Sequence, residues 1–466
     1  MSKDIRKRHK LEKKEKKSIP SGLPAHFSSI NPWAAGIDVG ATSHFVAVPE
    51  GCDETTVREF KSFTTELHVL ADWLKQCGIE TVAMESTGVY WIPLFELLEE
   101  KGFEVKLVDA RQVKNVSGRK TDVLDCQWLQ QLHTYGLLNA AFRPTEEVCA
   151  LRAYVRQRSM LIQHVVIHVQ HMQKALTQMN LQLHHVITDI TGTTGMEIIR
   201  AIVAGERDPK TLASKRNERC KSSLATIEKA LMGHYREEHL FSLQQALELH
   251  DIFQEKIVDC DNAIQKKLSE FAVCSTSKEA QPNPIKSKPK GKNAPSFDVE
   301  TQLRGLTGVN LMEVPGVNSL TALALISEIG LDMTRWKNAK QFTSWLGLCP
   351  GNKVSGGKRI SGRTRPSANR AAASLRIAAS TLYRSSTALG AFLRRLKSRL
   401  GPAKAITATA HKIAKIVYNM LREGVGYKEA GQDYYEQQYR VRVLNNLKKK
   451  AEVFGFELIE KVEMAT

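Results

Sequence analysis

Four acidic residues in the first third of the chain stand at predicted ends of strands and at the start of a predicted helix. Asp38 ends the apolar run AAGID and Glu85 ends the run TVAME. Strand ends in an open α/β sheet face the crevice where ligands usually bind. Asp122 and Asp125 are three residues apart in KTDVLDC, so they lie on one face of a helix that Thr121 is suited to cap. The four carboxylates could therefore converge on one pocket.

Asp125 carries the strongest indication of chemistry. It shares a helical stripe with Trp128, Leu129 and Leu132, where a carboxylate is costly unless a cation meets it. Oxygen ligands suit Mg²⁺ or Mn²⁺, and two such ions held by shared carboxylates can activate an attacking oxygen and stabilise a leaving one in phosphodiester chemistry. The alternative gives each acid a structural role, such as a helix first turn, a rim charge or a turn residue.

A second group of reactive and cationic residues lies in VSGGKRISGRTR. Ser355 precedes Gly356 and Gly357, which let backbone amides approach a phosphate. Four cations follow within the same stretch: Lys358, Arg359, Arg363 and Arg365. The absence of apolar periodicity predicts a loop, and a surface turn with solvated bases is the alternative.

The composition indicates a nucleic-acid partner. The chain has 466 residues and a net charge of +18, and it stays basic without the Lys-rich N-terminal stretch. Its 8 cysteines include no CxxC pair, which argues against a zinc site and suits a reducing compartment. No apolar run reaches membrane-spanning length. We expect a cytoplasmic protein that is nucleoid-associated when it is on DNA.

The segment 32–144 alternates strand and helix signals. Strands are expected over 33–40, 44–50, 57–63, 79–86 and 103–110, with helices over 65–78 and 89–102 and from Thr121 onward. Strands that first form a meander and then alternate with helices predict a mixed α/β sheet. The fold class is thus α/β followed by mostly α.

The remainder divides by composition. Its predicted parts, after a basic disordered tail at 1–31 and the α/β segment, are a helical coiled-coil region at 145–272, a flexible Lys/Pro/Ser-rich linker at 273–304, a mostly helical domain at 305–425 and charged helices at 426–466. Within 313–330, a tight turn at Pro315 and Gly316 between two helical patterns predicts a helix-hairpin-helix, or a simple αα corner.

The acids and the serine stretch together resemble a known family. Asp38, Glu85 and KTDVLDC resemble the DEDD pattern of the RuvC-like domain in insertion sequence 110/1111 family transposases. The stretches LMEVPGVNSLTALALISEIG, FTSWLGLCPGNKVSGGKRISGRTR and NRAAASLRIAAS resemble the family's C-terminal transposase domain. The match covers nearly everything between about 33 and 425. The stretch GIDVGATS also looks like the first phosphate loop of actin-like sugar kinases, but their second loop and adenosine glycines are missing.

This resemblance implies a mechanism and partners. It implies a RuvC-like (RNase H-like) fold whose four acids hold Mg²⁺, with Ser355 as the recombinase nucleophile and Ser361 as a weaker candidate. The family often has a second serine just before this one, and here that position is Val354. It also implies a structured guide (bridge) RNA that pairs with donor and target DNA, and dimers that assemble into a tetramer.

Other residues are candidates for nucleic-acid contact. Basic side chains beside the acids and on the helix after 145 are the predicted backbone contacts: Arg119, Lys120, Arg152 and Arg156, with Arg158 beside them. His164, His168 and His171 share one helical face, which favours packing or RNA contact over a metal site because no other ligand is nearby in the sequence.

Two other functions remain compatible with the residues. A junction-resolving nuclease would hydrolyse DNA with the acids alone, and a nucleic-acid-binding scaffold would perform no catalysis. Replacement of Ser355 separates the first from a serine recombinase, and replacement of Asp125 separates the second from both.

Overall fold

The computed structural model describes residues 29–109, 121–271, 291, 293–365 and 369–459. The chain forms two compact units, one up to Arg143 and one from Pro144 onward. Among the described residues, no helix is long and apolar enough to cross a membrane. Most of the predicted tail at 1–31 and of the predicted linker at 273–304 lies outside the described residues.

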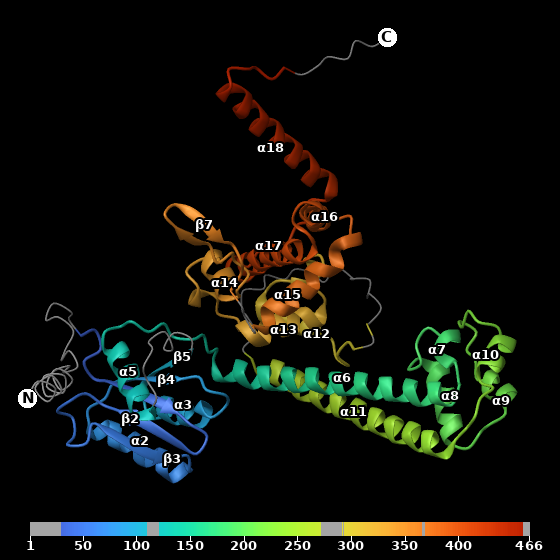
Figure 1. Ribbon diagram of the computed structural model, residues 1–466, viewed down its shortest axis with the longest axis horizontal. Helices are drawn as coiled ribbons and strands as arrows, with labels where there is room; N and C mark the ends of the chain where they lie inside the picture. The colour runs from blue at the N-terminus through green and yellow to red at the C-terminus, as the bar shows by residue number, and fades with distance from the viewer. Residues whose placement is uncertain (1–28, 110–120, 272–290, 292, 366–368, 460–466) are drawn as a thin grey trace, which may run out of the picture. The chain divides into compact units, whose positions relative to one another are not determined.

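The first unit is built on a five-stranded mixed sheet in the order β3-β2-β1-β4-β5 (Figure 1). Its strands are β1 (Ala34–Val39), β2 (Ser43–Ala47), β3 (Val57–Lys61), β4 (Thr81–Glu85) and β5 (Glu104–Val108). Its described helices are α2 (Thr64–Gln76), α3 (Trp91–Glu100) and α5 (Asp122–Thr134). β1 pairs antiparallel with β2 and parallel with β4. The predicted mixed α/β sheet is confirmed, and its arrangement is consistent with a RuvC-like fold.

The two faces of this sheet are covered differently. One face packs on α2 and α3 through a large apolar core that includes Ile37, Met84, Leu70 and Leu94. The opposite face carries α5 over a much smaller cluster of Ala83, Val108 and Leu129. Side chains alternate between faces along a strand, so the central strands are apolar on the α2–α3 side and bear small or polar residues on the α5 side.

Gly36 in β1 lets α5 lie directly on the sheet. A Cβ atom at this position would collide with the backbone nitrogen of Gln130 and the backbone oxygen of Cys126. Those atoms belong to the helix backbone and cannot swing aside as a flexible side chain could. The α5 axis can therefore reach its observed distance from β1 only because residue 36 has no side chain.

The second unit begins with a long helical hairpin. α6 (Glu146–Gln178) and α11 (Glu237–Glu270) run antiparallel, because Arg158 contacts Asp261 while His164, further along α6, stacks on the earlier Phe253 of α11. The region at 145–272, predicted as helical, is divided into several helices, with breaks after α6 and after α10. Short helices cap the far end of the hairpin (Figure 1): α7 (Leu183–Val186), α8 (Thr193–Val203), α9 (Pro209–Ser214) and α10 (Leu224–Ala230). They share one apolar core with the ends of α6 and α11.

The rest of the second unit is mostly helical. Its elements are α12 (Val299–Thr307), η1 (Leu311–Glu313), α13 (Ser319–Ile329), η2 (Met333–Arg335), α14 (Ala339–Trp345), β6 (Lys353–Ser355), β7 (Lys358–Ser361), α15 (Arg370–Thr381), η3 (Leu382–Arg384), α16 (Ala388–Leu400), α17 (Pro402–Glu423) and α18 (Gln432–Val453). Before the Pro315–Gly316 turn the structure has only a 3₁₀ turn, η1, where the sequence predicts a full helix. Between 426 and 459 it has one helix, where the sequence predicts a pair.

Replacing Gly36 by alanine should destabilise the first unit by about 1–3 kcal/mol or more, because the new methyl group has to displace a helix backbone. Amide hydrogen exchange of α5 peptides in the intact chain should speed up first. Gly305→Ala is the matched control, since a Cβ there meets open space inside α12 and alanine favours a helix. Unchanged exchange in α5 of the Gly36 variant would contradict this account.

Candidate functional site: four carboxylates and a serine hairpin

Asp38 and Glu85 lie on the same face of two neighbouring parallel strands. Gly36 faces α5, so Asp38, two residues further along β1, faces it too. β1 and β4 pair with Gly36 opposite Ala83, and Ile37 opposite Met84. Continuing this register by one residue places Asp38 beside Glu85. Both side chains are half-buried at the strand ends, as the sequence predicts.

α5 brings the other two acids to this face. Thr121 caps the helix by accepting a hydrogen bond from the Leu124 backbone nitrogen at 3.4 Å, as predicted. Asp122 is exposed and Asp125 is half-buried. The fully buried stripe differs from the predicted one, since it consists of Cys126, Leu129 and His133 while Trp128 and Leu132 are half-buried. Asp125 therefore borders the buried stripe, where solvent still reaches it.

The far end of α5 is fixed by buried polar contacts. The His133 ring lies 2.9 Å from the Thr81 hydroxyl on β4, and Asn31 donates to the His133 carbonyl at 2.7 Å. Burial lowers the pKa of His133 to about 4, with nearby Lys106 acting in the same direction. The neutral imidazole thus anchors the helix without adding charge. Sequence reasoning missed this anchor, although Thr81 is a polar residue in an otherwise apolar strand.

Electrostatics links the four carboxylates. Burial and then, in decreasing order, the negative charges of Glu85, Asp122 and Asp125 together raise the pKa of Asp38 to about 6. A hydrogen bond from the Val39 backbone opposes this only weakly. Each of the three other predicted acids therefore lies within electrostatic range of Asp38. Like charges gathered in a half-buried position favour binding of a proton or a cation.

The chemistry of this group suits a hard cation, although its spacing in the described chain is open. Its ligand atoms are carboxylate oxygens, which are the ligands that Mg²⁺ prefers. The neighbouring Cys126 contributes no thiolate, because burial and the charge of Asp38 raise its pKa to about 12. Among the described residues, however, no three His, Cys, Asp or Glu side chains are close enough to hold one ion. A bound metal would require the carboxylates to close in.

The predicted serine loop is a β-hairpin. β6 and β7 pair antiparallel with Ser355 opposite Lys358. The two residues between them, Gly356 and Gly357, have φ of 54° and 74°. Two successive positive φ values are typical of a type I′ turn, whose twist matches that of paired strands. The loop prediction was wrong because the Gly-Gly pair is a hairpin signal even without apolar alternation.

The hairpin exposes Ser355 to solvent. Ser355 is exposed beside the turn, and Ser361 pairs with Lys353 at the opposite end. Val354 and Ile360 are 61% and 69% exposed, so apolar side chains flank the serine on the same hairpin. An exposed hydroxyl beside a hairpin turn can contact the phosphate backbone of a bound nucleic acid, whereas a buried hydroxyl cannot.

The predicted nucleic-acid contacts fall into three groups. Exposed cations lie on and after the hairpin: Lys358, Arg363 and Arg365. Arg119 and Lys120, like the side chain of Arg359, lie outside the described residues. The third group consists of the α6 arginines, which contact protein.

Arg152 and Arg156 bind the C-terminal end of α13. Arg156 makes two 2.8 Å hydrogen bonds to the Glu328 carboxylate, and Arg152 donates to the carbonyls of Ser327 and Glu328. Arg158 is 3% exposed and pairs with buried Asp261, so its predicted contact with a phosphate backbone was wrong. An arginine on a long helix is desolvated by packing that the sequence of that helix does not reveal.

The histidine face packs rather than forming a metal site in the described chain. His164 and His168 both stack on Phe253, with ring centroids 5.2 and 5.3 Å away.

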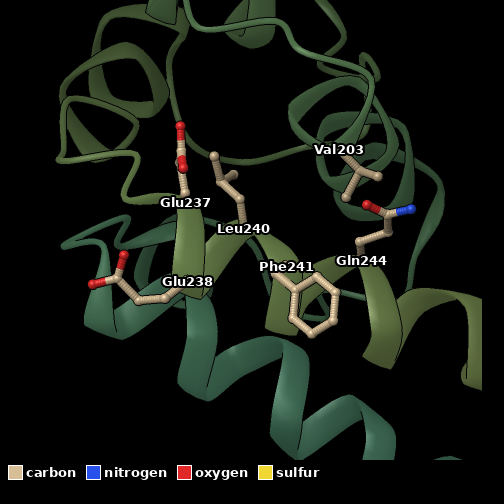
Figure 2. Close-up of a pocket in the computed structure, with 6 residues that line it drawn as sticks. All are labelled: Val203, Glu237, Glu238, Leu240, Phe241 and Gln244. Carbon is tan, nitrogen blue, oxygen red and sulfur yellow. The ribbon is translucent and has the colours of Figure 1, made fainter.

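A separate open pocket of about 540 Å³ lies at the start of α11 and contains none of the predicted site residues (Figure 2). Figure 2 shows its two acids, Glu237 and Glu238, pointing in different directions.

The raised pKa of Asp38 predicts a pH-dependent stability of the metal-free chain. A carboxyl whose pKa is about 6 when folded and 3.8 in the reference state favours folding less once it is ionised. The free energy of unfolding should therefore fall by at most about 3 kcal/mol as the pH rises from about 4 to about 6. Urea denaturation across this range measures the change.

Asp38→Asn should remove that pH dependence and should be more stable than the wild type at neutral pH without metal. Adding Mg²⁺ should stabilise the wild type and not this variant. Asp122→Asn, at an exposed position, is the control and should show a smaller change. Identical pH profiles for the wild type and Asp38→Asn would contradict the electrostatic coupling.

Two family models match the chain in the two regions that carry this chemistry. A model of DEDD transposases, described as Transposase, matches residues 35–181, which contain the four acids. A second model, described as Transposase IS116/IS110/IS902 family, matches residues 309–393, which contain the serine hairpin. No curated protein matches the chain. The two matches, in this order along one chain, show that it belongs to the IS110 family of transposases, enzymes that cut and rejoin DNA.

Proposed function

We propose that this transposase exchanges DNA strands through a Mg²⁺-dependent DEDD site and a serine nucleophile. Asp38, Glu85, Asp122 and Asp125 would hold the metal, and Ser355 would attack the DNA. The observation that carries the proposal is the raised pKa of Asp38, to which all three other acids contribute. Four carboxylates that repel one another at strand ends are a costly arrangement for a protein that only binds nucleic acid.

Ser355 would form a covalent intermediate. Its Oγ atom would bond to the scissile phosphorus, the bond from phosphorus to a deoxyribose oxygen would break, and that oxygen would take up a proton. The phosphoserine ester conserves the energy of the broken bond, so a second DNA hydroxyl can displace the serine and rejoin a strand. When bound, Mg²⁺ would stabilise negative charge on the reacting oxygens.

The hairpin suits this role. Lys358 lies directly opposite Ser355 in the strand register, and directly opposed side chains of an antiparallel pair share one face. Its ammonium group can hold a phosphate oxygen beside the hydroxyl. The glycine turn leaves backbone amides next to the serine uncovered by side chains.

Guide RNA and oligomerisation belong to the same proposal. The resemblance to the insertion sequence 110/1111 family implies a structured bridge RNA that selects donor and target DNA, and a dimer that assembles into a tetramer on the nucleoid. The net charge of +18 supports binding of more than one polyanion. The five-strand order supports a RuvC-like fold for the first unit.

Ser355→Ala should abolish both strand cleavage and joining, because the covalent intermediate forms on the Ser355 hydroxyl. Ser361→Ala is the matched control on the same hairpin and should retain most activity. Strand transfer on DNA carrying the element's ends, with the phosphoserine adduct detected by denaturing gel, measures both. Cleavage that persists in Ser355→Ala would instead support metal-dependent hydrolysis by the acids alone.

RNA guidance predicts that the intact transposase, purified from cells that carry its element, retains one enriched RNA. Sequencing that RNA should reveal segments complementary to donor and target DNA flanking the gene. Treatment of the transposase with a ribonuclease should stop strand transfer, and adding the RNA back after the ribonuclease is removed should restore it. An active preparation that contains no enriched RNA would refute guidance while leaving the serine mechanism intact.

A further inference from the structure

The positive charge of the chain is concentrated in one acid-free stretch. Residues 333–422 contain nineteen Lys and Arg and no Asp or Glu, whereas the whole chain has an excess of 18 bases. The other residues together therefore carry no net positive charge. The acid-free stretch ends with α16 and α17, against which the last helix, α18, is anchored.

Aromatic and cationic side chains hold the beginning of α18. Tyr435 packs edge-on against Phe392 of α16 with ring centroids 6.2 Å apart. The Arg395 guanidinium lies over the rings of both Tyr435 and Tyr439, at 4.9 and 3.3 Å. Arg394 also donates a 2.7 Å hydrogen bond to Gln432. The first two turns of α18 are thus firmly attached to a basic support.

Beyond Tyr439, most side chains of α18 are exposed, although Arg442 lies within electrostatic range of Lys412 on α17. None of the 22 residues of α18 is buried. Helices in proteins are stabilised mainly by packing one face against other elements, and an isolated helix of this length is marginal in water. A helix that is firmly held at its start and largely exposed along its length is suited to bind a partner that fits around it.

One face of α18 carries side chains of the types that can hydrogen-bond to DNA bases. At helical spacing, five exposed residues fall within about 100° of each other on this base-reading face: Gln438, Arg442, Asn445, Asn446 and Lys449. Arg and Lys pair with guanine, and Asn and Gln pair with adenine, in the major groove. The stretch 437–451 contains five cations and no acid. Charge and residue type therefore agree on a nucleic-acid partner.

We propose that α18 binds in the major groove of duplex DNA through its base-reading face. The major groove of B-form DNA admits a helix, whereas the major groove of A-form RNA is too deep and narrow for side chains to read. α18 lies beyond the residues that match the transposase family models, so the family match does not assign this role. The inference rests on action on DNA, and it requires neither Ser355 nor the four acids.

The test compares two charge-matched variants of the full-length, nucleic-acid-free transposase. Arg442→Gln with Lys449→Gln removes two cations from the base-reading face. Arg440→Gln with Lys448→Gln removes the same residue types from other faces of the same helix. Fluorescence anisotropy measures binding to a mixed-sequence DNA duplex of about 30 base pairs, roughly three helical turns, and to an RNA duplex of the same sequence. Circular dichroism checks that helix content is kept, since glutamine is a good helix former.

The base-reading variant should bind the DNA duplex at least roughly tenfold more weakly, because both cations placed against base edges are lost. The matched variant should lose about threefold or less, and RNA duplex binding should be the same in both. Asn445→Ala with Asn446→Ala, which keeps the charge, should broaden the set of duplexes selected from a random pool. Ser355→Ala should bind like the wild type, so failure of the strand-transfer mechanism would not affect these results.

Three results would overturn the proposal. Equal losses in the two charge-matched variants would show diffuse attraction without a reading face. An equal loss for RNA and DNA duplexes would exclude major-groove insertion. The third result concerns Leu444→Gln with Leu447→Gln on the opposite, apolar face. If this variant lost both oligomerisation and DNA binding while the base-reading variant bound DNA normally, the apolar face would dock on a second copy of the chain.

Discussion

The close approach of α5 to β1 at Gly36 is the constraint on which the acid site depends. The helix backbone touches the strand where a side chain would otherwise stand. Asp125 immediately precedes Cys126, one of the two contact residues, and lies within electrostatic range of Asp38, while the strand register brings Glu85 alongside Asp38. A side chain at position 36 would move the helix outward and separate the carboxylates by a similar distance. Coulomb repulsion between them would then weaken, and with it the affinity for a cation.

The packing of α5 on the sheet imposes two energetic costs on the carboxylates, which are burial and mutual repulsion. Packing α5 tightly half-buries the carboxylates, which raises the pKa of Asp38 and makes the ion-free state less favourable. Among the described residues, no cationic side chain is among the causes that act on Asp38, so no described cation offsets the repulsion between the carboxylates. At the other end of α5 the solution is different, because His133 is kept neutral by burial and is hydrogen-bonded to Thr81. The C-terminal end of α5 is thus anchored by a neutral side chain, whereas negative charges gather at its N-terminal end.

Charge is used in the opposite sense in the second unit. Glu328 forms a partly buried ion pair with Arg156, which holds α6 against α13. Asp261 forms a buried ion pair with Arg158, which also donates a hydrogen bond to the Asn293 carbonyl. Removing one partner of such a pair would leave a desolvated charge. The stretch from α14 to Arg422 shows the reverse, since it contains no acid, and cations there such as Arg395 lie over tyrosine rings. The acid-free stretch 333–422 therefore carries a net positive charge, and it contains the serine hairpin.

The sequence by itself determined the α/β order of the first unit, the cap at Thr121 and the positions of Asp38 and Glu85 at strand ends, because these depend on local periodicity and residue type. It also determined the family, since two motif sets occur in order. Only the tertiary structure decided that residue 36 must be glycine, that Cys126 and His133 form the buried stripe in place of Trp128 and Leu132, and that Arg158 is inside an ion pair. These outcomes depend on contacts between residues far apart in the chain, such as Arg158 with Asp261, and helical periodicity cannot reveal which partner removes a side chain from water.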